Sequence, residues 1–158
     1  NLPAIAGMAA ALEDAVSGME ERGRTMTALR ERLIAGLSKI PYSFLNGERK
    51  KRLPGNVSFC FEGIEGESLL LHLDFKGIAA SSGSACTSGS LDPSHVLLAC
   101  GLPHEIAHGS LRLTISADNT AEEMDYISAV TAETVSLLRS MSPVWDKLER
   151  GELAHFER

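Results

Sequence analysis

The chain is poor in cysteine and in aromatic residues, and its acidic residues outnumber the basic ones. Of 158 residues, three are cysteine and 5% are aromatic, and the formal net charge is −6 at pH 7. A small, odd number of cysteines argues against a disulfide framework and favours a reducing compartment such as the cytoplasm. The acidic balance argues against nucleic acid and against an anionic membrane surface as the main partner. With 44% apolar residues, the chain can still form a hydrophobic core.

Long apolar runs and a signal-peptide pattern are also missing. No run approaches the roughly 20 residues that a membrane-spanning helix needs. The sequence opens on Asn1 instead of methionine and enters a helical pattern almost at once, so we expect it to be a fragment of a longer protein. The one basic run, residues 48–52, is expected to be a solvated loop, with a phosphate-binding patch as the alternative.

Amphipathic helices are predicted at both ends of the chain. From Pro3 to about Lys39 apolar residues recur every three, four or seven positions, which predicts one long helix with a kink near Gly23. A second long helix is expected after Thr120, which has capping-box spacing to Glu123. It should end before residue 143, leaving a polar tail whose one apolar anchor is tryptophan.

The middle of the chain predicts short strands and helices. Residues 57–61 and 110–116 alternate as strands with one apolar face each, and residues 78–81 are a further candidate strand. Residues 67–77 predict a helix ended by a glycine cap, and a later helix should begin at Asp92 and Pro93. These elements predict an α+β lobe, with a small mixed or antiparallel sheet and helices packed on one face.

One cysteine differs from the other two in its surroundings. Cys60 and Cys100 have apolar neighbours and are expected in the core, whereas Cys86 lies in "SSGSACTSGS" at residues 81–90. Hydroxyl groups there can donate hydrogen bonds to a thiolate and lower its pKa. The supporting hydroxyls are Ser84, Thr87 and Ser88. This composition predicts a reactive thiol, with a flexible loop of no chemical role as the alternative.

Two further patterns carry candidate chemistry. Arg112 lies mid-strand opposite apolar residues, where a guanidinium can bind a carboxylate in bidentate fashion, or can be an ordinary solvated residue. In "HEIAH", His104 and His108 have zinc-ligand spacing on a helix, with Glu105 as a candidate base. Proline before this motif and glycine after it leave too short a helix and no spaced third ligand, which favours a capped turn.

The segment from "GESLLLHLDFKG" through "SSGSACTSG" to "AHGSLRLTIS" resembles the cysteine desulfurases of the class-V aminotransferase family. The resemblance runs over nearly the whole chain and implies the small C-terminal domain of a fold-type I enzyme that depends on pyridoxal 5'-phosphate. Residues 1–40 would be a linking helix and residues 41–158 the small domain, with the cysteine loop at about 81–91. The large cofactor-binding domain and its lysine would lie outside this chain, so no cofactor binding by the fragment is expected.

The same resemblance implies roles for two residues. Cys86 would take sulfur from L-cysteine as a persulfide, releasing L-alanine, and Arg112 would hold the substrate carboxylate. The intact enzyme would be a homodimer that delivers sulfur to an acceptor or scaffold protein, as in iron–sulfur cluster assembly, and the fragment alone would be inactive. Two other hypotheses remain: a non-catalytic sulfur carrier that uses Cys86, and a zinc peptidase built on residues 104–108.

Overall fold

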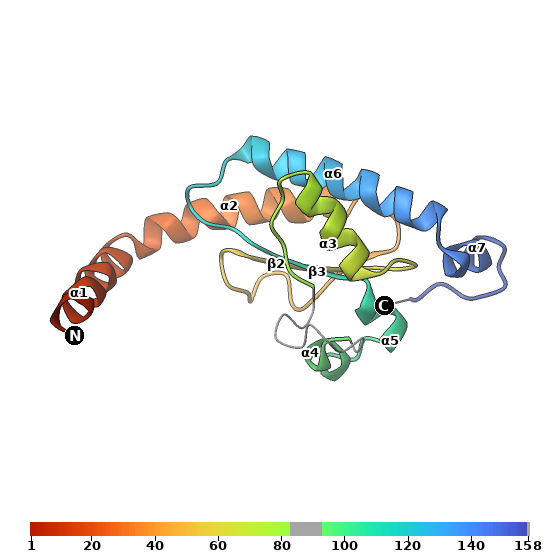
Figure 1. Ribbon diagram of the computed structural model, residues 1–158, viewed down its shortest axis with the longest axis horizontal. Coiled ribbons are helices and arrows are strands. Elements are labelled where there is room, and N and C mark those ends of the chain that lie inside the picture. Colours follow the sequence, from red (N-terminus) through yellow and green to blue (C-terminus); the bar gives the residue numbers. More distant parts are fainter. Residues whose placement is uncertain (83–92, 158) are drawn as a thin grey trace.

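The computed structural model describes residues 1–82 and 93–157. Its elements are α1 (Leu2–Ser17), α2 (Met19–Leu37), β1 (Ser43–Leu45), β2 (Asn56–Phe61), α3 (Gly66–Phe75), α4 (His95–Ala99), α5 (His104–His108), β3 (Ser110–Thr114), α6 (Ala121–Ser140) and α7 (Pro143–Glu149). Helices α2 and α6 run side by side along one side of the sheet, and α4 and α5 lie on the other (Figure 1).

The described strands form a three-stranded antiparallel sheet in the order β1-β2-β3. The alternation predicted for β2 and β3 is present, because Val57, Phe59, Leu111 and Leu113 are all buried on one face. Helices α2, α3 and α6 cover this face. The α+β class is therefore confirmed, as is the packing of the main helices on one face.

A second, smaller apolar cluster lies on the opposite face of the sheet. Cys60 is fully buried there, among residues of α4, α5 and the turns beside them. The core position predicted for Cys60 is confirmed. Cys100 is exposed, so the same prediction for Cys100 is wrong. Cys100 is the C-cap of α4. This helix has only five residues, which is too short to cover a side chain at its end.

The long N-terminal helix is broken at Gly18 and not at Gly23. Gly18 caps the end of α1, and its backbone N–H donates to the carbonyls of Asp14 and Val16. The Arg22 guanidinium also donates to the carbonyl of Asp14, from the next helix. Gly23 lies inside α2 in ordinary helical backbone. The break is therefore associated with a polar contact between α1 and α2, from Arg22 to Asp14. The spacing of apolar residues cannot predict such a contact.

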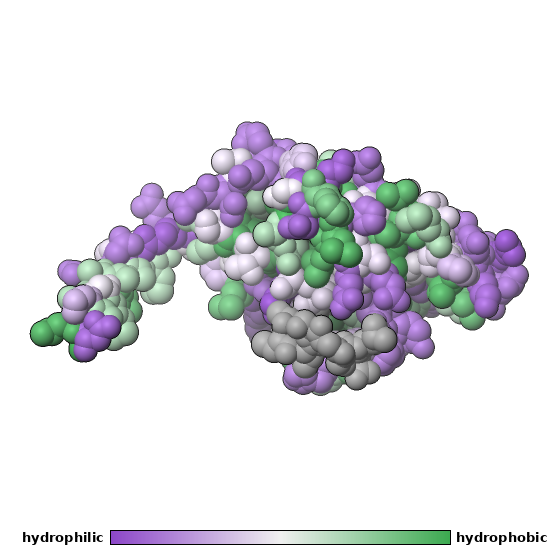
Figure 2. All heavy atoms as spheres, in the orientation of Figure 1, coloured by the Kyte–Doolittle hydropathy of each residue, from purple (hydrophilic) through white to green (hydrophobic). Residues whose placement is uncertain are grey.

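Helix α1 carries an apolar stripe that the rest of the described chain does not cover. None of its residues is buried, and the stripe side chains are 59% to 80% exposed. The stripe continues into α2 and consists of Leu2, Ile5, Met8, Leu12, Val16 and Met19. Figure 1 shows α1 projecting from the body, and Figure 2 shows apolar side chains along it. No described helix is long and apolar enough to cross a membrane.

The segments before and after residues 83–92 differ from their predictions. Residues 78–81 form no strand, because only Ser81 pairs with a neighbouring strand, through one isolated bridge. Helix α4 begins at His95 with Ser94 as its N-cap, so Pro93 precedes the helix. Asp92, the predicted cap, lies outside the described residues. The glycine that ends α3 is confirmed, since Gly77 has a φ of 76°.

At the C-terminus, the capping box of Thr120 and Glu123 is confirmed. The polar tail is not: residues 143–149 form α7, with Leu148 buried. The residues after α7 are held against the body, because Glu62 accepts hydrogen bonds from Phe156 N–H at 2.8 Å and contacts His155 Nδ1 at 2.7 Å. The polar composition of this segment does not predict its contacts with Glu62.

One buried cation joins the end of α6 to the sheet. Arg139 is 6% exposed and donates to the carbonyls of Glu62 at 3.0 Å, Pro41 at 2.8 Å and Tyr42 at 3.3 Å. Its guanidinium carbon also lies 4.0 Å from the centroid of the Trp145 ring. Burial lowers the pKa of Arg139 to about 10, against the opposing effects of Glu62 and Tyr42, so the group is charged at neutral pH.

We expect Arg139→Met to lower the free energy of unfolding by about 3 kcal/mol, because the buried carbonyl of Glu62 and the part-buried carbonyl of Pro41 lose a charged donor. For a chain of this length, the melting temperature should fall by roughly 10 °C, measured by circular dichroism. The matched control is Arg32→Met, since Arg32 forms an exposed ion pair with Asp125. Equal melting temperatures for the two variants would contradict the assignment.

Candidate functional site

The candidate site is built on β3, where the backbone of Arg112 is paired on both sides. Across one edge it lies opposite Ser58 of β2. Across the other it exchanges two hydrogen bonds with Ser81, donating N–H to Ser81 O at 2.6 Å and accepting from Ser81 N–H at 3.0 Å. The peptide that carries the guanidinium is thus fixed from both sides, while the side chain is exposed.

The side chain of Arg112 is exposed on β3. Among residues 1–82 and 93–157, no carboxylate lies within ion-pair distance of its guanidinium. A planar guanidinium presents donors in a rigid fork that matches a carboxylate. The exposed guanidinium therefore agrees with the predicted role in binding a carboxylate. Within the part of the chain that the structure describes, Arg112 lacks the salt bridge that an ordinary sheet arginine often forms.

Ser58 and Asn46 belong to the same region but were not among the predicted site residues. Asn46 donates its side-chain amide to Ser58 Oγ at 3.0 Å and to Cys60 Sγ at 3.3 Å. These contacts order the face of β2 that lies beside Arg112. The alternation of residues 57–61 predicts that Ser58 lies on that face, so the sequence could have identified Ser58 as a site residue. The sequence could not have identified Asn46, because its contact with Ser58 depends on the pairing of β1 with β2.

The predicted nucleophile lies outside the described residues. Cys86 and the supporting hydroxyls Ser84, Thr87 and Ser88 fall in residues 83–92. The last described part of the chain before them includes Ser81, the partner of Arg112, and Cys86 follows Ser81 by five positions in the sequence. Five residues span at most about 18 Å, so covalent connection alone limits how far the Cys86 Cα can be from the Ser81 Cα.

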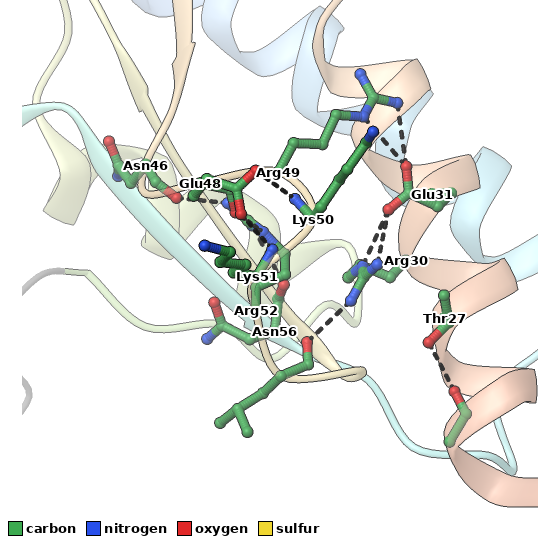
Figure 3. Close-up of polar contacts among 12 residues, drawn as sticks. Thr27, Arg30, Glu31, Asn46, Glu48, Arg49, Lys50, Lys51, Arg52 and Asn56 are labelled. Atoms are coloured by element: carbon green, nitrogen blue, oxygen red, sulfur yellow. Dashed lines mark hydrogen bonds and ion pairs between the residues drawn. The ribbon is translucent and has the colours of Figure 1, made fainter. Parts of the chain in front are cut away.

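The basic run forms the hairpin loop between β1 and β2 (Figure 3). Glu31 pairs with Arg30 at 2.8 Å and with Arg49 at 3.1 Å, and the hydrogen bond from Arg30 lowers the Glu31 pKa below its usual value. Arg52 donates to the Asn46 carbonyl at 2.7 Å, and burial lowers the Arg52 pKa. These internal pairings agree with the solvated-loop prediction more than with a phosphate site.

The "HEIAH" motif forms the one-turn helix α5, with the rings of His104 and His108 4.6 Å apart between centroids. Throughout the described part of the chain, no group of three or more histidine, cysteine, aspartate or glutamate side chains could hold a metal ion. The zinc-peptidase hypothesis therefore has no ligand set in the described residues.

The described residues do not fit a covalent anchor for pyridoxal phosphate. A lysine that condenses with an aldehyde cofactor sits in a pocket that depresses its pKa. All lysines of this chain are exposed, namely Lys39, Lys50, Lys51, Lys76 and Lys147. No chemical step through this cofactor can therefore be assigned to these lysines.

Comparisons with known proteins show which proteins this chain is similar to. The family described as aminotransferase class V matches residues 1–127. "Cysteine desulfurase IscS" from Methanosarcina thermophila is 56% identical over 147 residues, which cover 93% of this chain and 36% of that protein. "Cysteine desulfurase NifS" from Azotobacter vinelandii is 45% identical, covering 92% of this chain and 36% of that protein.

A comparison with solved structures finds the same kind of relative. A structure titled "NIFS-LIKE PROTEIN" aligns with a TM-score of 0.75 and 33% identity, covering 87% of this chain and 34% of that one. The chain thus spans about a third of the length of the relatives it matches. Since the family match extends over most of the sequence, the chain belongs to the class-V aminotransferase family.

Proposed function

We propose that this chain is the sulfur-accepting part of a cysteine desulfurase. Arg112 binds the carboxylate of L-cysteine, and the Cys86 thiol receives its sulfur as a persulfide while L-alanine leaves. The observation that carries the proposal is the exposed guanidinium of Arg112, whose backbone pairs with Ser81, five positions before Cys86. Relatives that are 45% to 56% identical over this region are named cysteine desulfurases.

The proposed reaction balances without an external oxidant. L-Cysteine and the Cys86 thiol give L-alanine and the Cys86 persulfide. The carbon–sulfur bond of cysteine breaks, a sulfur–sulfur bond forms at Cys86, and the carbon gains a hydrogen in place of sulfur. Arg112 contributes by holding the substrate in one orientation, which keeps its sulfur directed toward the attacking thiolate. The persulfide then passes to an acceptor protein, as in iron–sulfur cluster assembly.

The division into a linking helix, residues 1–40, and a small domain, residues 41–158, is part of the proposal. The exposed apolar stripe of α1 would pack on the portion of the longer relatives that this chain does not match, and the intact enzyme would be a cytoplasmic homodimer. Pyridoxal phosphate would supply electron-sink chemistry from that other portion. The exposed lysines of this chain support that assignment.

The chain alone is expected to be unable to turn over L-cysteine. After addition of pyridoxal phosphate, the purified 158-residue chain should show no stable absorbance band of a lysine-bound cofactor and no alanine formation. Its exposed lysines can react only weakly and without selectivity. Amino-acid analysis and visible spectroscopy measure both readouts. A stable band with turnover would overturn this part of the proposal.

A non-catalytic sulfur carrier remains the second candidate, because the chain offers a thiol and no cofactor anchor among its exposed lysines. A carrier would load Cys86 from a persulfide donor but would give no alanine in any context. The experiment that separates the two replaces the matching 36% of the Methanosarcina thermophila relative with this chain. A desulfurase segment should support alanine formation in that chimera, whereas a carrier should not.

A further inference from the structure

A groove at the C-terminal end of the fold is not used by the proposed sulfur transfer. It is a cavity of about 920 Å³ between α5, the start of α3, the α6–α7 junction and the tail of residues 153–157. In Figure 1 the chain after α7 turns back toward α5, where the C-terminus lies. The volume lies within the range for ligand pockets, ~300–1,000 Å³, so the chemistry of the lining has to identify the occupant.

The rim of this C-terminal groove is acidic. Among the residues that the structure describes, four glutamates line it and no lysine or arginine does: Glu62, Glu65, Glu105 and Glu157. Glu62 is buried and already contacts His155 and the Phe156 N–H, so it fixes the tail in place. The other three carboxylates are exposed. Glu105 belongs to the "HEIAH" motif, which the sulfur-transfer proposal leaves without a role.

The lining of the C-terminal groove also includes large apolar side chains that remain in contact with solvent. Met141, Val144 and Leu153 are 60%, 51% and 46% exposed, and they come from the α6 end, α7 and the tail. Apolar surface inside an acidic rim is complementary to a ligand that carries both apolar and cationic groups. A purely apolar partner would leave the carboxylates desolvated without a counter-charge.

We propose that the C-terminal groove binds a basic, amphipathic peptide segment of a partner protein, with its apolar side chains on Met141, Val144 and Leu153 and its lysines or arginines at Glu65 and Glu105. This site does not depend on sulfur transfer. In the hairpin loop of this same chain, basic residues precede the exposed Leu53 in the sequence. A second copy of the chain must therefore be tested as a competing occupant.

The probe is a fluorescein-labelled helical peptide of leucine and lysine, about three turns long, and its partner control replaces lysine with glutamate. Fluorescence anisotropy should show micromolar binding of the lysine peptide, weakened by salt, and no binding of the glutamate peptide. Glu65→Gln with Glu105→Gln should weaken binding about tenfold. The matched control is Glu13→Gln with Glu133→Gln, which removes the same charge from exposed sites outside the groove.

A second pair of variants tests the apolar floor. Met141→Ser with Val144→Ser should weaken the lysine peptide about tenfold, whereas Leu71→Ser, an exposed apolar site on α3 outside the groove, should not. Equal affinity of the groove variants and their controls would overturn the proposal. So would concentration-dependent self-association that Glu65→Gln with Glu105→Gln abolishes, seen by sedimentation, because it would make a second copy the occupant.

Discussion

Replacing Cys86 by serine is expected to abolish alanine formation from L-cysteine in the chimera with the Methanosarcina thermophila relative. Serine keeps nearly the same size, but its oxygen cannot form the sulfur–sulfur bond of a persulfide. Removing the nucleophile of an enzyme lowers its turnover by several orders of magnitude, so we expect a loss of at least ~10³-fold in kcat. Alanine release and sulfide release after reduction are the two measurements.

The chain supplies its own matched control for this experiment. Cys100 is exposed, whereas Cys60 is buried, so Cys100→Ser removes an accessible thiol of the described residues by the same chemical change. The Cys100 variant should retain most of the activity, and mass spectrometry should find the added sulfur atom on Cys86. Loss of activity in both variants, or full activity in the Cys86 variant, would contradict the proposed nucleophile.

How much of the fold follows from the sequence depends on whether an element is stabilised locally. The capping box at Thr120 and the alternation in β2 and β3 use neighbouring residues, and the structure confirms them. Strand β1 has only three residues, and nothing in so short a run distinguishes it from a loop. Its pairing with β2 stabilises it instead.

The errors at the C-terminus have a common cause. His155 and Phe156 are held by Glu62, which lies 93 and 94 positions away in the chain. Such contacts depend on the tertiary arrangement of residues that are far apart in the sequence, so the local polar composition does not predict them. Likewise, whether a cysteine is buried depends on what packs over it, which is why similar apolar neighbours gave the right result for Cys60 and the wrong one for Cys100.

For the candidate site, the sequence provided the residue types but not the arrangement that relates them. Arg112 and Cys86 are 26 positions apart, and periodicity says only that Arg112 faces away from the core. The structure adds that the backbone of Arg112 pairs with Ser81, at the start of the quoted loop. That pairing joins segments that are far apart in the sequence, so the sequence alone could not predict it. It makes a joint role of Arg112 and Cys86 testable.

The second large effect is expected at Arg112. Arg112→Met in the chimera should reduce kcat/KM for L-cysteine by on the order of 10²–10³-fold, because the substrate carboxylate loses its bidentate partner and its fixed orientation. Stability should change little, since the Arg112 side chain is exposed and the pairings with Ser58 and Ser81 use the backbone. Arg112→Lys should retain part of the activity through charge alone, with a raised KM.

A change of substrate distinguishes carboxylate binding from a structural role of Arg112. L-Cysteine methyl ester has no negative charge for a guanidinium to bind, so the wild-type chimera should prefer L-cysteine strongly and the Arg112→Met variant should prefer it weakly. Thr114→Val serves as the matched control, because Thr114 is the next exposed residue on the same face of β3, and it should keep the wild-type preference. If Arg112→Met still discriminates between the two substrates as the wild type does, another group binds the carboxylate and Arg112 is an ordinary solvated residue of the sheet.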